Sequence, residues 1–408
     1  MLVVTANWAI ADGTLLAPPR REQVEWIGAV HRAAIRAGVR RDGRYAPVDR
    51  VDVVFAGDTL DGLTSTVWLD AVRPWHEGSR AARAAATVMV AAANRGRPLL
   101  AAVSRWARKG LPLPGADRWG RPAVGREHRA AVRVTFLPGD RDRWLAAASA
   151  RIGRHGLGVA AAWSADGVAV CHGAEADPVC SAAEPGRPTL AASLAVDLVA
   201  RFAAAVRSRA DLWPACRPLV ARLGAARPFA LPLLVADWLA RVEPASALAP
   251  AVREAWRTAV SDWHRRARLD EPDCGAGCDP IDAIAGWLDG DGRRSRTAEG
   301  DVAAVLDVTA RPARPAAGTL VVGHLPASAT ERAVVGLAVS PRPATPAAAT
   351  GVDVACVAPD RGRSGPTGVV FADRGRPDAW EWMVPGSDHP ALDAPAPPVA
   401  HHRIVEAA

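Results

Sequence analysis

The stretch VVFAGDTLDGL, from Val53 to Leu63, starts as an apolar run and stops at Gly57 and Asp58. Short apolar runs that end in turn residues are typical of buried strands in an α/β sheet. Ligands of such sheets collect at the carboxyl ends of the strands, where the loops vary while the sheet holds their roots. Asp58 is therefore a candidate ligand, although an Asp after Gly at a strand end is also a common helix cap.

Four further apolar runs end in a turn and a polar or aromatic residue. They are Leu2 to Thr5 before Ala6-Asn7-Trp8, Val132 to Leu137 before Pro138-Gly139-Asp140, Val168 to Cys171 before His172-Gly173, and Thr319 to Val322 before Gly323-His324. Asp140, His172 and His324 thus lie, like the carboxylate above, just beyond a predicted strand. Two carboxylates and two imidazoles form a donor set suited to a divalent ion such as Zn, Mn or Fe.

In this order the blocks resemble those of the calcineurin-like metallophosphoesterases. VVFAGDTLDGL resembles the family's Gly-Asp-x-x-Asp block, FLPGDRDRW its Gly-Asn-His-Asp/Glu block, VAVCHGAEADP its middle His-Gly segment and LVVGHLPA its closing Gly-His-x-His block. The resemblance extends from about Leu2 to Ala327, with long insertions between the blocks. It implies an α/β fold, the four-layer αββα metallophosphoesterase sandwich with inserted helical segments.

The resemblance also implies that one of the family's two metal positions is lost. Family members hold the first metal with an N-terminal Asp-x-His and the last His of Gly-His-x-His, and here Ala6, Trp8 and Pro326 stand at those places. Asp12 lies a few residues further on and would have to turn inward to replace a ligand. Asp12 followed by Gly13 is also an ordinary turn.

The second metal position is kept. In the family it uses the bridging Asp, the Asn of Gly-Asn-His, the middle His and the first His of the closing block, which correspond here to Asp58, Asp140, His172 and His324. Only Asp140 departs from the pattern, and Asp in place of Asn keeps a coordinating oxygen while adding a negative charge. The resemblance therefore implies one divalent ion, Mn, Fe or Zn, able to polarise a phosphoryl oxygen.

Arg141 stands where the family has the His of Gly-Asn-His, which is thought to assist phosphate binding or leaving-group protonation. Arginine does not deprotonate in proteins and cannot serve as a general acid, but it can bind a phosphate bidentately. The sequence leaves two interpretations open: Arg141 contacts phosphate, or residues 140–143 form a surface salt-bridge cluster. Asp61 is predicted to support the ligands or cap a helix rather than to bind metal.

Two functions follow from these residues. The first is a one-metal hydrolase of weak activity that acts on a phosphorylated small molecule or another phosphate ester. The second is a non-catalytic pseudoenzyme that uses the same fold as a binding or scaffold module. The lost first-metal ligands favour the second function, and the complete second set favours the first. The sequence identifies neither the substrate nor an oligomeric state.

The predicted phosphoesterase domain covers residues 1–384, with helical insertions at about 64–131 and 211–288, and a Pro/Ala-rich tail at 385–408. Three helices are predicted, one of them inside the first insertion, and short antiparallel strands follow the last His block. The helices are Glu22 to Ala37, Ser79 to Arg108 and Leu190 to Arg207, and the strands are Val352 to Val357, Gly368 to Phe371 and Ala379 to Met383.

Composition argues against several other classes of protein. The net charge of +7 comes from arginines interspersed with Asp and Glu, and no basic run alternates with aromatic residues, which argues against a nucleic-acid groove. No window reaches the ~18 uninterrupted apolar residues of a membrane span. The start, MLVVTANWAIADG, lacks the basic region of a secretory signal, so we expect a cytoplasmic protein without a membrane partner. Cys274 and Cys278, with His264 upstream, have zinc-ligand spacing, but zinc knuckles usually bring a second close pair, which the sequence lacks.

Overall fold

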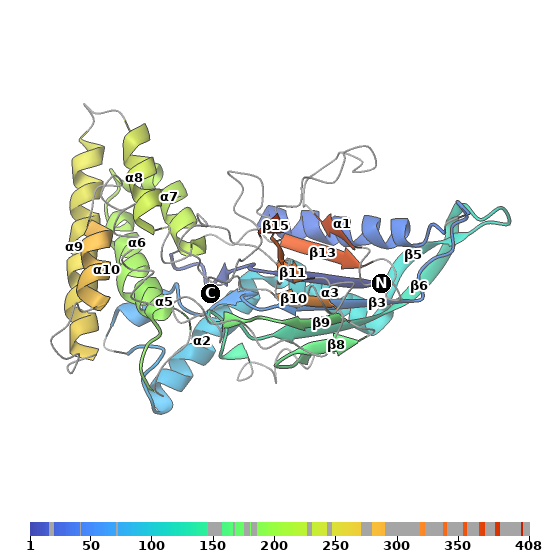
Figure 1. The fold of residues 1–408 in the computed structure, drawn as a ribbon, viewed down its shortest axis with the longest axis horizontal. Coiled ribbons are helices and arrows are strands. Elements are labelled where there is room, and N and C mark those ends of the chain that lie inside the picture. Colours follow the sequence, from blue (N-terminus) through green and yellow to red (C-terminus); the bar gives the residue numbers. More distant parts are fainter. Residues whose placement is uncertain are drawn as a thin grey trace, which may run out of the picture.

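The computed structural model describes residues 1–15, 20–40, 42–70, 72–145, 157–165, 168–174, 180, 186–226, 231–242, 247–270 and 280–289, together with the strand segments 319–322, 338–340, 354–356, 367–371, 380–383 and 401–402. Within these residues the protein is mixed α/β, with two large mixed sheets beside a separate group of helices (Figure 1). The predicted α/β class is therefore confirmed.

The first sheet has seven strands in the order β14-β13-β1-β3-β6-β5, with β7 also pairing with β6. Its strands are β1 (Leu2–Ala6), β3 (Arg50–Ala56), β5 (Leu111–Ala116), β6 (Pro122–Leu137), β7 (Gly158–Val159), β13 (Thr367–Phe371) and β14 (Trp380–Met383). β1, β3, β6 and β7 run parallel. The carboxyl ends of β1, β3 and β6 therefore meet at one edge, where the predicted ligands follow.

The second sheet has six strands in the order β15-β12-β11-β10-β9-β8. They are β8 (Trp163–Ala165), β9 (Val168–Cys171), β10 (Thr319–Val322), β11 (Ala338–Ser340), β12 (Val354–Cys356) and β15 (His401–His402). β9 and β10 are parallel, and the other pairs are antiparallel. A short parallel pair, β2 (Ile10–Ala11) with β4 (Leu60–Asp61), follows the ends of β1 and β3.

Alternation along the central strands builds a core on each face of the first sheet. Val53 and Phe55 of β3 pack in one hydrophobic cluster with Trp26 and Trp106, which lie on helices. The neighbouring β3 residues Val54 and Ala56 pack instead with Val168 and Val170 of β9, in a cluster between the two sheets. Since successive strand residues point to opposite faces, this pattern fixes the register of the buried strands.

Two helices cover the outer face of the first sheet. They are α1 (Arg20–Ala37) and α3 (Arg97–Lys109). The 3-10 turn η1 (Thr66–Leu69) and helix α2 (Ser79–Arg95) precede α3 in the chain. The rings of Trp26 and Phe55 lie 5.6 Å apart, and those of Trp26 and Trp106 6.2 Å apart. These aromatic contacts join helix and sheet, and the large buried rings contribute much of the core area.

The segment expected as a helical insertion at 64–131 is only partly helical. After α3 the chain forms a long β-hairpin of β5 and β6, which extends beyond the rest of the molecule (Figure 1). Arg126, Glu127 and Arg129 are exposed on this ribbon. Both faces of the outer part of this ribbon contact solvent. Its sequence therefore lacks the apolar alternation by which a half-buried strand is recognised.

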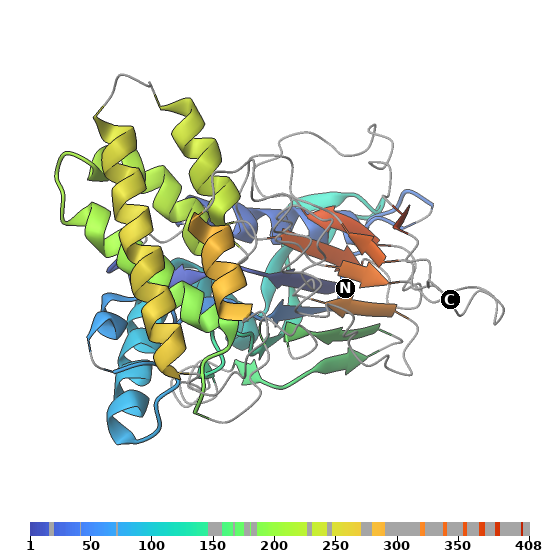
Figure 2. The same ribbon diagram turned by 60° about the vertical axis from the view of Figure 1, so that its left-hand side comes forward.

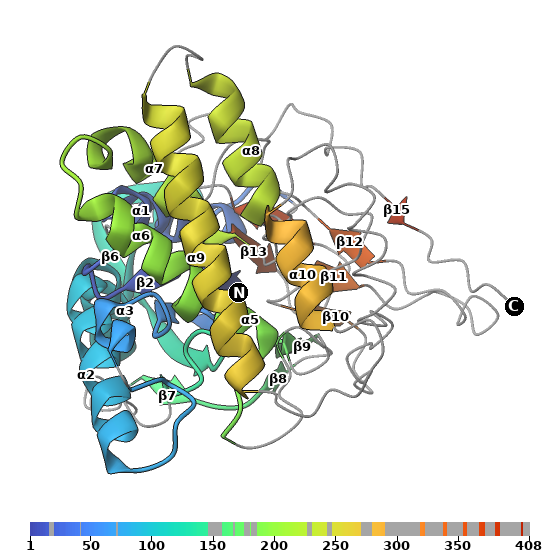
Figure 3. The same cartoon turned by 90° about the vertical axis from the view of Figure 1, so that its left-hand side faces the viewer.

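The remaining helices form what we call the helical subdomain, Leu190–Asp289. They are α5 (Leu190–Ser193), the π-helical turn η3 (Leu194–Ala200), α6 (Arg201–Arg207), α7 (Trp213–Ala225), α8 (Leu231–Arg241), α9 (Leu248–Asp270) and α10 (Pro280–Asp289). They gather on one side of the sheets, with α9 running the length of the group (Figures 2 and 3). A hydrophobic cluster of their own holds them together, including Phe202, Trp256 and Trp263.

None of the helices in the described part of the chain is both long enough and apolar enough to span a membrane. The residues 385–408, expected as a tail, include β15, which pairs with β12.

Candidate metal centre

His172 is the best-defined member of the centre. It directly follows β9 and is almost completely buried. Its Nδ1 lies 2.9 Å from the carbonyl oxygen of Ala56, at the end of β3. A carbonyl can only accept, so Nδ1 must carry the hydrogen and Nε2 is left facing away from the sheet. Metal-binding histidines are usually oriented in this way, by a backbone carbonyl on the nitrogen that does not bind the metal.

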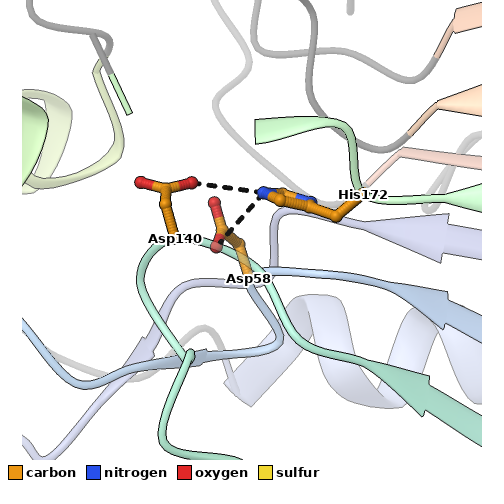
Figure 4. A group of neighbouring side chains, drawn as sticks. All are labelled: Asp58, Asp140 and His172. Atoms are coloured by element: carbon orange, nitrogen blue, oxygen red, sulfur yellow. Dashed lines mark hydrogen bonds and ion pairs between the residues drawn. The ribbon is translucent and has the colours of Figure 1, made fainter. Parts of the chain in front are cut away.

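The Nε2 atom of His172 faces two carboxylates (Figure 4). It lies 3.2 Å from Asp140 Oδ1 and 3.7 Å from Asp58 Oδ1. Donor atoms of the three residues all lie within 4.8 Å of one another. Two donors of a tetrahedral ion, each ~2.1 Å from it, are ~3.4 Å apart, so the imidazole-to-carboxylate distances suit one shared ion.

Asp58 is held in position by its own backbone. Its φ of 52° is left-handed, a conformation that is uncommon for residues other than glycine, and it follows Gly57 with a φ of 93°. The carbonyl of Asp58 accepts from Ala9 N at 2.8 Å, and its Oδ1 accepts from Arg141 N at 3.0 Å. The loop after β6 therefore holds the carboxylate that lies after β3.

Two glycines allow the ligands to approach each other. A Cβ at Gly139 would lie 2.2 Å from Asp58 Oδ1, and a Cβ at Gly57 would lie 2.0 Å from His172 Nδ1. No side chain fits at either distance, so both positions need glycine for the close approach.

Charge is concentrated at the centre. Burial raises the pKa of Asp58 well above its usual range, and the charge of Asp140 adds to this effect. Burial alone would lower the pKa of His172, but Asp58 and Asp140 together raise it to about 10. The two acidic groups thus favour a positive charge at this place, and a divalent cation bound by the neutral imidazole would supply it. The donor types, the orientation of His172 and the separations therefore fit one divalent ion.

Asp142 is a structural residue that the sequence did not reveal. It is completely buried, and its two oxygens accept from three backbone N–H groups: Gly139 at 2.6 Å, Thr59 at 2.9 Å and Leu60 at 3.2 Å. Burial raises its pKa to about 6 although these hydrogen bonds oppose the shift. The interpretation of residues 140–143 as a surface salt-bridge cluster is therefore wrong. Two of these three hydrogen bonds span 83 and 82 residues of sequence, so no local pattern signals them.

The guanidinium group of Arg141 forms hydrogen bonds with other parts of the protein. One terminal nitrogen donates to Asp61 Oδ2 at 3.2 Å and to the carbonyl of Gly224 at 2.6 Å, and the other donates to the carbonyl of Ala226 at 3.4 Å. Three of its five N–H donors are therefore directed at protein acceptors. Arg141 thus ties the ligand loop to the carboxyl end of α7 in the helical subdomain.

Asp61 supports the centre without binding to it. It is fully buried, and its Oδ1 accepts from the backbone N–H groups of Leu63 and Thr64 at 2.9 and 3.0 Å. Its Oδ2 pairs with Arg141. The predicted supporting role is consistent with these contacts, since both oxygens already have partners.

Trp8 and Ala6, which stand where the resemblance would expect first-metal ligands, are both buried, and Trp8 belongs to the hydrophobic core. Trp8 packs edge-to-face against Trp26 at 5.6 Å and donates from Nε1 to Thr5 Oγ1 at 3.1 Å. Asp12 does not turn toward the ligands: its Oδ1 accepts from Thr14 N at 2.8 Å, and its Oδ2 accepts from Ser65 Oγ at 2.6 Å.

Several predicted residues lie outside the described part of the chain. His324, the fourth expected ligand, and Pro326 follow β10 directly but are not described, and neither are Cys274 and Cys278. β10 pairs in parallel with β9, with Val322 opposite Cys171. His264 is described and pairs with Asp282, its Nε2 lying 2.6 Å from Oδ1.

Comparison of the chain with protein-family models, with curated proteins and with solved structures finds no match in any of the three. The resemblance to the calcineurin-like metallophosphoesterases therefore remains a prediction from the motifs.

Proposed function

We propose that this chain is a metallophosphoesterase-like protein that binds one divalent metal ion, Mn, Fe or Zn, and hydrolyses phosphate esters weakly. Asp58, Asp140 and His172 would hold the ion, and His324 would join them from the end of β10. The observation that carries the proposal is the hydrogen bond from His172 Nδ1 to the carbonyl oxygen of Ala56 at 2.9 Å, which directs Nε2 toward both carboxylates.

The arrangement of strands supports the family assignment within this proposal. The ligands follow β3, β6 and β9, and the helices α1 and α3 lie outside the first sheet, whose inner face packs on the second. Helix, sheet and sheet are three successive layers of the expected αββα sandwich. We propose the complete four-layer form as the fold to which the chain belongs.

The chemistry divides between the ion and the chain. When bound, a divalent ion acts as a Lewis acid on a phosphoryl oxygen. The chain's own residues orient that ion: His172 is fixed through Ala56, and Asp58 is fixed through the backbone N–H of Arg141. Two of the five N–H donors of Arg141 remain without a protein partner among the described residues and would be available to a phosphate oxygen.

Weak activity is expected because only one of the family's two metal positions keeps its ligands. Two-metal sites stabilise both the attacking and the leaving oxygen of the displacement. Trp8 is packed into the core and Ala6 is fully buried, so neither of these two residues offers a donor atom for a second ion.

Elemental analysis of the purified protein tests the metal site. We expect about one equivalent of Mn, Fe or Zn per chain. His172→Ala should lose most of this metal, because Asp58 and Asp140 alone bind an ion less tightly than the three residues together. His264→Ala is the matched control, since this histidine pairs with Asp282 away from the centre. Metal content that is equal in His172→Ala and the wild type would disprove the site.

Turnover of aryl phosphate mono- and diesters tests the reaction. We expect slow hydrolysis that depends on the added metal and is abolished in Asp58→Asn. The alternative function is a non-catalytic binding or scaffold module, favoured by the hydrophobic filling around Trp8 and by the protein contacts of Arg141. Full metal occupancy without turnover for any metal would select this alternative.

A further inference from the structure

A second buried charge cluster lies between the loop after η1 and the helical subdomain, and its centre is Asp197 in η3. Arg73 approaches it from the loop: Nε and a terminal nitrogen lie 3.1 and 3.0 Å from Asp197 Oδ1. Arg73 is also buried and donates to the carbonyls of Trp68 and Asp70. Arg73 and Asp197 therefore form a fixed pair with few unused donors.

Two further arginines reach the same carboxylate oxygen. Arg201 Nε donates to Asp197 Oδ1 at 3.2 Å, and Arg201 also donates to the carbonyl of Leu69. Arg266, from α9, has its Nε 3.9 Å from that oxygen, which is too far for a hydrogen bond. Three guanidinium groups thus meet at one oxygen of one carboxylate.

Arg266 is the member of the cluster without a hydrogen-bond partner. Its Nε is buried and lies 3.9 Å from Asp197, and Arg266 makes no hydrogen bond to any residue that the structure describes. Its side chain is 38% exposed and that of Arg201 18%. A buried donor without a partner is rare in native proteins and points to a water or an ion that completes it.

The charges in this region do not balance. Asp262, which also acts on Arg266, is itself paired with Arg265. The cluster of Arg73, Arg201 and Arg266 around Asp197 therefore carries two excess positive charges. Burial, together with the charges of Arg201 and Arg73, lowers the pKa of Arg266, although Asp197 and Asp262 oppose this shift. A dianion would remove the excess.

We propose that Arg201 and Arg266 form a binding site for a phosphate group, with the Arg73–Asp197 pair as its rigid support. A phosphate dianion matches the two excess charges, and the planar guanidinium fork binds phosphate oxygens bidentately. The partly exposed side chains of Arg201 and Arg266 give the group access from solvent, and a phosphate oxygen would provide the acceptor that Arg266 Nε lacks.

The backbone at this place supports a functional role. Asp197 lies in η3, a π-helical turn, and Arg201 begins α6 directly after it. π-helical turns are rare and frequently mark functional sites. The site joins η3 and α6 to α9, which pack against one another in the helical subdomain (Figures 1 and 3). The proposal is independent of the metal centre, which lies on other elements.

Thermal unfolding with inorganic phosphate tests this site. The experiment uses full-length His172→Ala protein in EDTA, so that no bound metal contributes a phosphate ligand. We expect a saturable rise in Tm with phosphate, larger than with sodium chloride at equal ionic strength. Arg266→Gln should weaken phosphate binding about tenfold or more, as expected for the loss of hydrogen bonds to a charged group. Arg265→Gln, one residue away on α9 and paired with Asp262, is the matched control.

Arg266→Lys provides a second variant that keeps the charge but lacks the guanidinium fork. We expect it to bind phosphate more weakly than the wild type, measured by the same titration. Tighter binding of phenyl phosphate than of inorganic phosphate would identify an organic phosphate as the ligand, and equal binding would identify the free ion. A response to phosphate no greater than to chloride, or an unchanged response in Arg266→Gln, would overturn the proposal.

Discussion

Gly139 shows how little room the metal centre leaves for change at a single residue. A Cβ there would lie 2.2 Å from Asp58 Oδ1 and 2.6 Å from the backbone nitrogen of Asp58. The backbone nitrogen cannot rotate away, so the loop after β6 must shift to accept a methyl group. The substitution therefore acts directly on the distance between two metal ligands.

Gly139→Ala is expected to destabilise the protein by about 1–3 kcal/mol, the usual effect of overpacking. It should also weaken metal binding about 10- to 100-fold, because a supporting contact of a ligand is displaced. Chemical denaturation and metal titration measure the two effects. Gly286→Ala is the control: this glycine is exposed on α10 with no atom within 4 Å of the added Cβ, so stability should stay equal or rise. Wild-type metal affinity in Gly139→Ala would contradict the proposed geometry.

The sequence predicted the residues of the candidate metal centre better than the residues that support them. Asp58, Asp140 and His172 could be predicted because each follows an apolar strand, and strand ends are visible in a sequence. Asp142 could not, since a buried carboxylate that binds backbone N–H groups looks like a surface charge between two arginines. Arg73, Asp197 and Arg266 are far apart in the sequence and come together only through tertiary packing. No local sequence pattern predicts this contact.

Among the elements, prediction depended on burial. β9 (Val168–Cys171) was predicted with its observed bounds, because it is a short apolar run between turns. The hairpin of β5 and β6 was mostly missed. Pro112 and Pro114 interrupt the strand pattern in the sequence of β5, and the outer part of β6 is polar. Ser79 to Arg108 was predicted as one helix, whereas Gly96 ends α2 and a proline in the first turn begins α3.

Arg141 is the link between the loop after β6 and helix α7. Its guanidinium group neutralises the buried Asp61 and binds the carbonyls of Gly224 and Ala226, where the negative end of the helix dipole lies. We expect Arg141→Met to destabilise the protein by about 3–5 kcal/mol, because it leaves a buried carboxylate without its partner. Hydrogen exchange should become faster in the last turn of α7.

Arg143→Met is the control for this link. Arg143 lies over the ring of Trp144 at 4.5 Å, a contact that contributes about 0.5–1 kcal/mol. Denaturant unfolding and hydrogen exchange compare the two variants. Equal stability of Arg141→Met and Arg143→Met would show that the buried pair with Asp61 contributes little.

At the scale of the whole molecule, one hydrophobic core packs against the outer face of the first sheet, another lies within the helical subdomain, and a smaller cluster joins η1 and α2 to η3. Polar contacts supplement the packing between them: Arg141 with the end of α7, Arg207 with the carbonyl of Thr14, and Arg73 with Asp197. Of these three contacts only the Arg73–Asp197 pair joins two buried ionised side chains. It is therefore the contact most sensitive to the loss of one partner.

Arg73→Met should consequently uncouple the two cores. Asp197 keeps Arg201, but the carbonyls of Trp68 in η1 and of Asp70 just after it lose their donor, so the subdomain is held less firmly to the sheets. Hydrogen exchange followed by mass spectrometry compares peptides of α9 with peptides of β3. In the wild type we expect both to exchange through one global opening, and in Arg73→Met we expect α9 to exchange faster while β3 changes little. Arg207→Met, which removes an exposed contact between the same parts, should change stability by only about 0.5 kcal/mol. Equal acceleration of α9 and β3 in Arg73→Met would instead mean that the two cores unfold as one unit even without this pair.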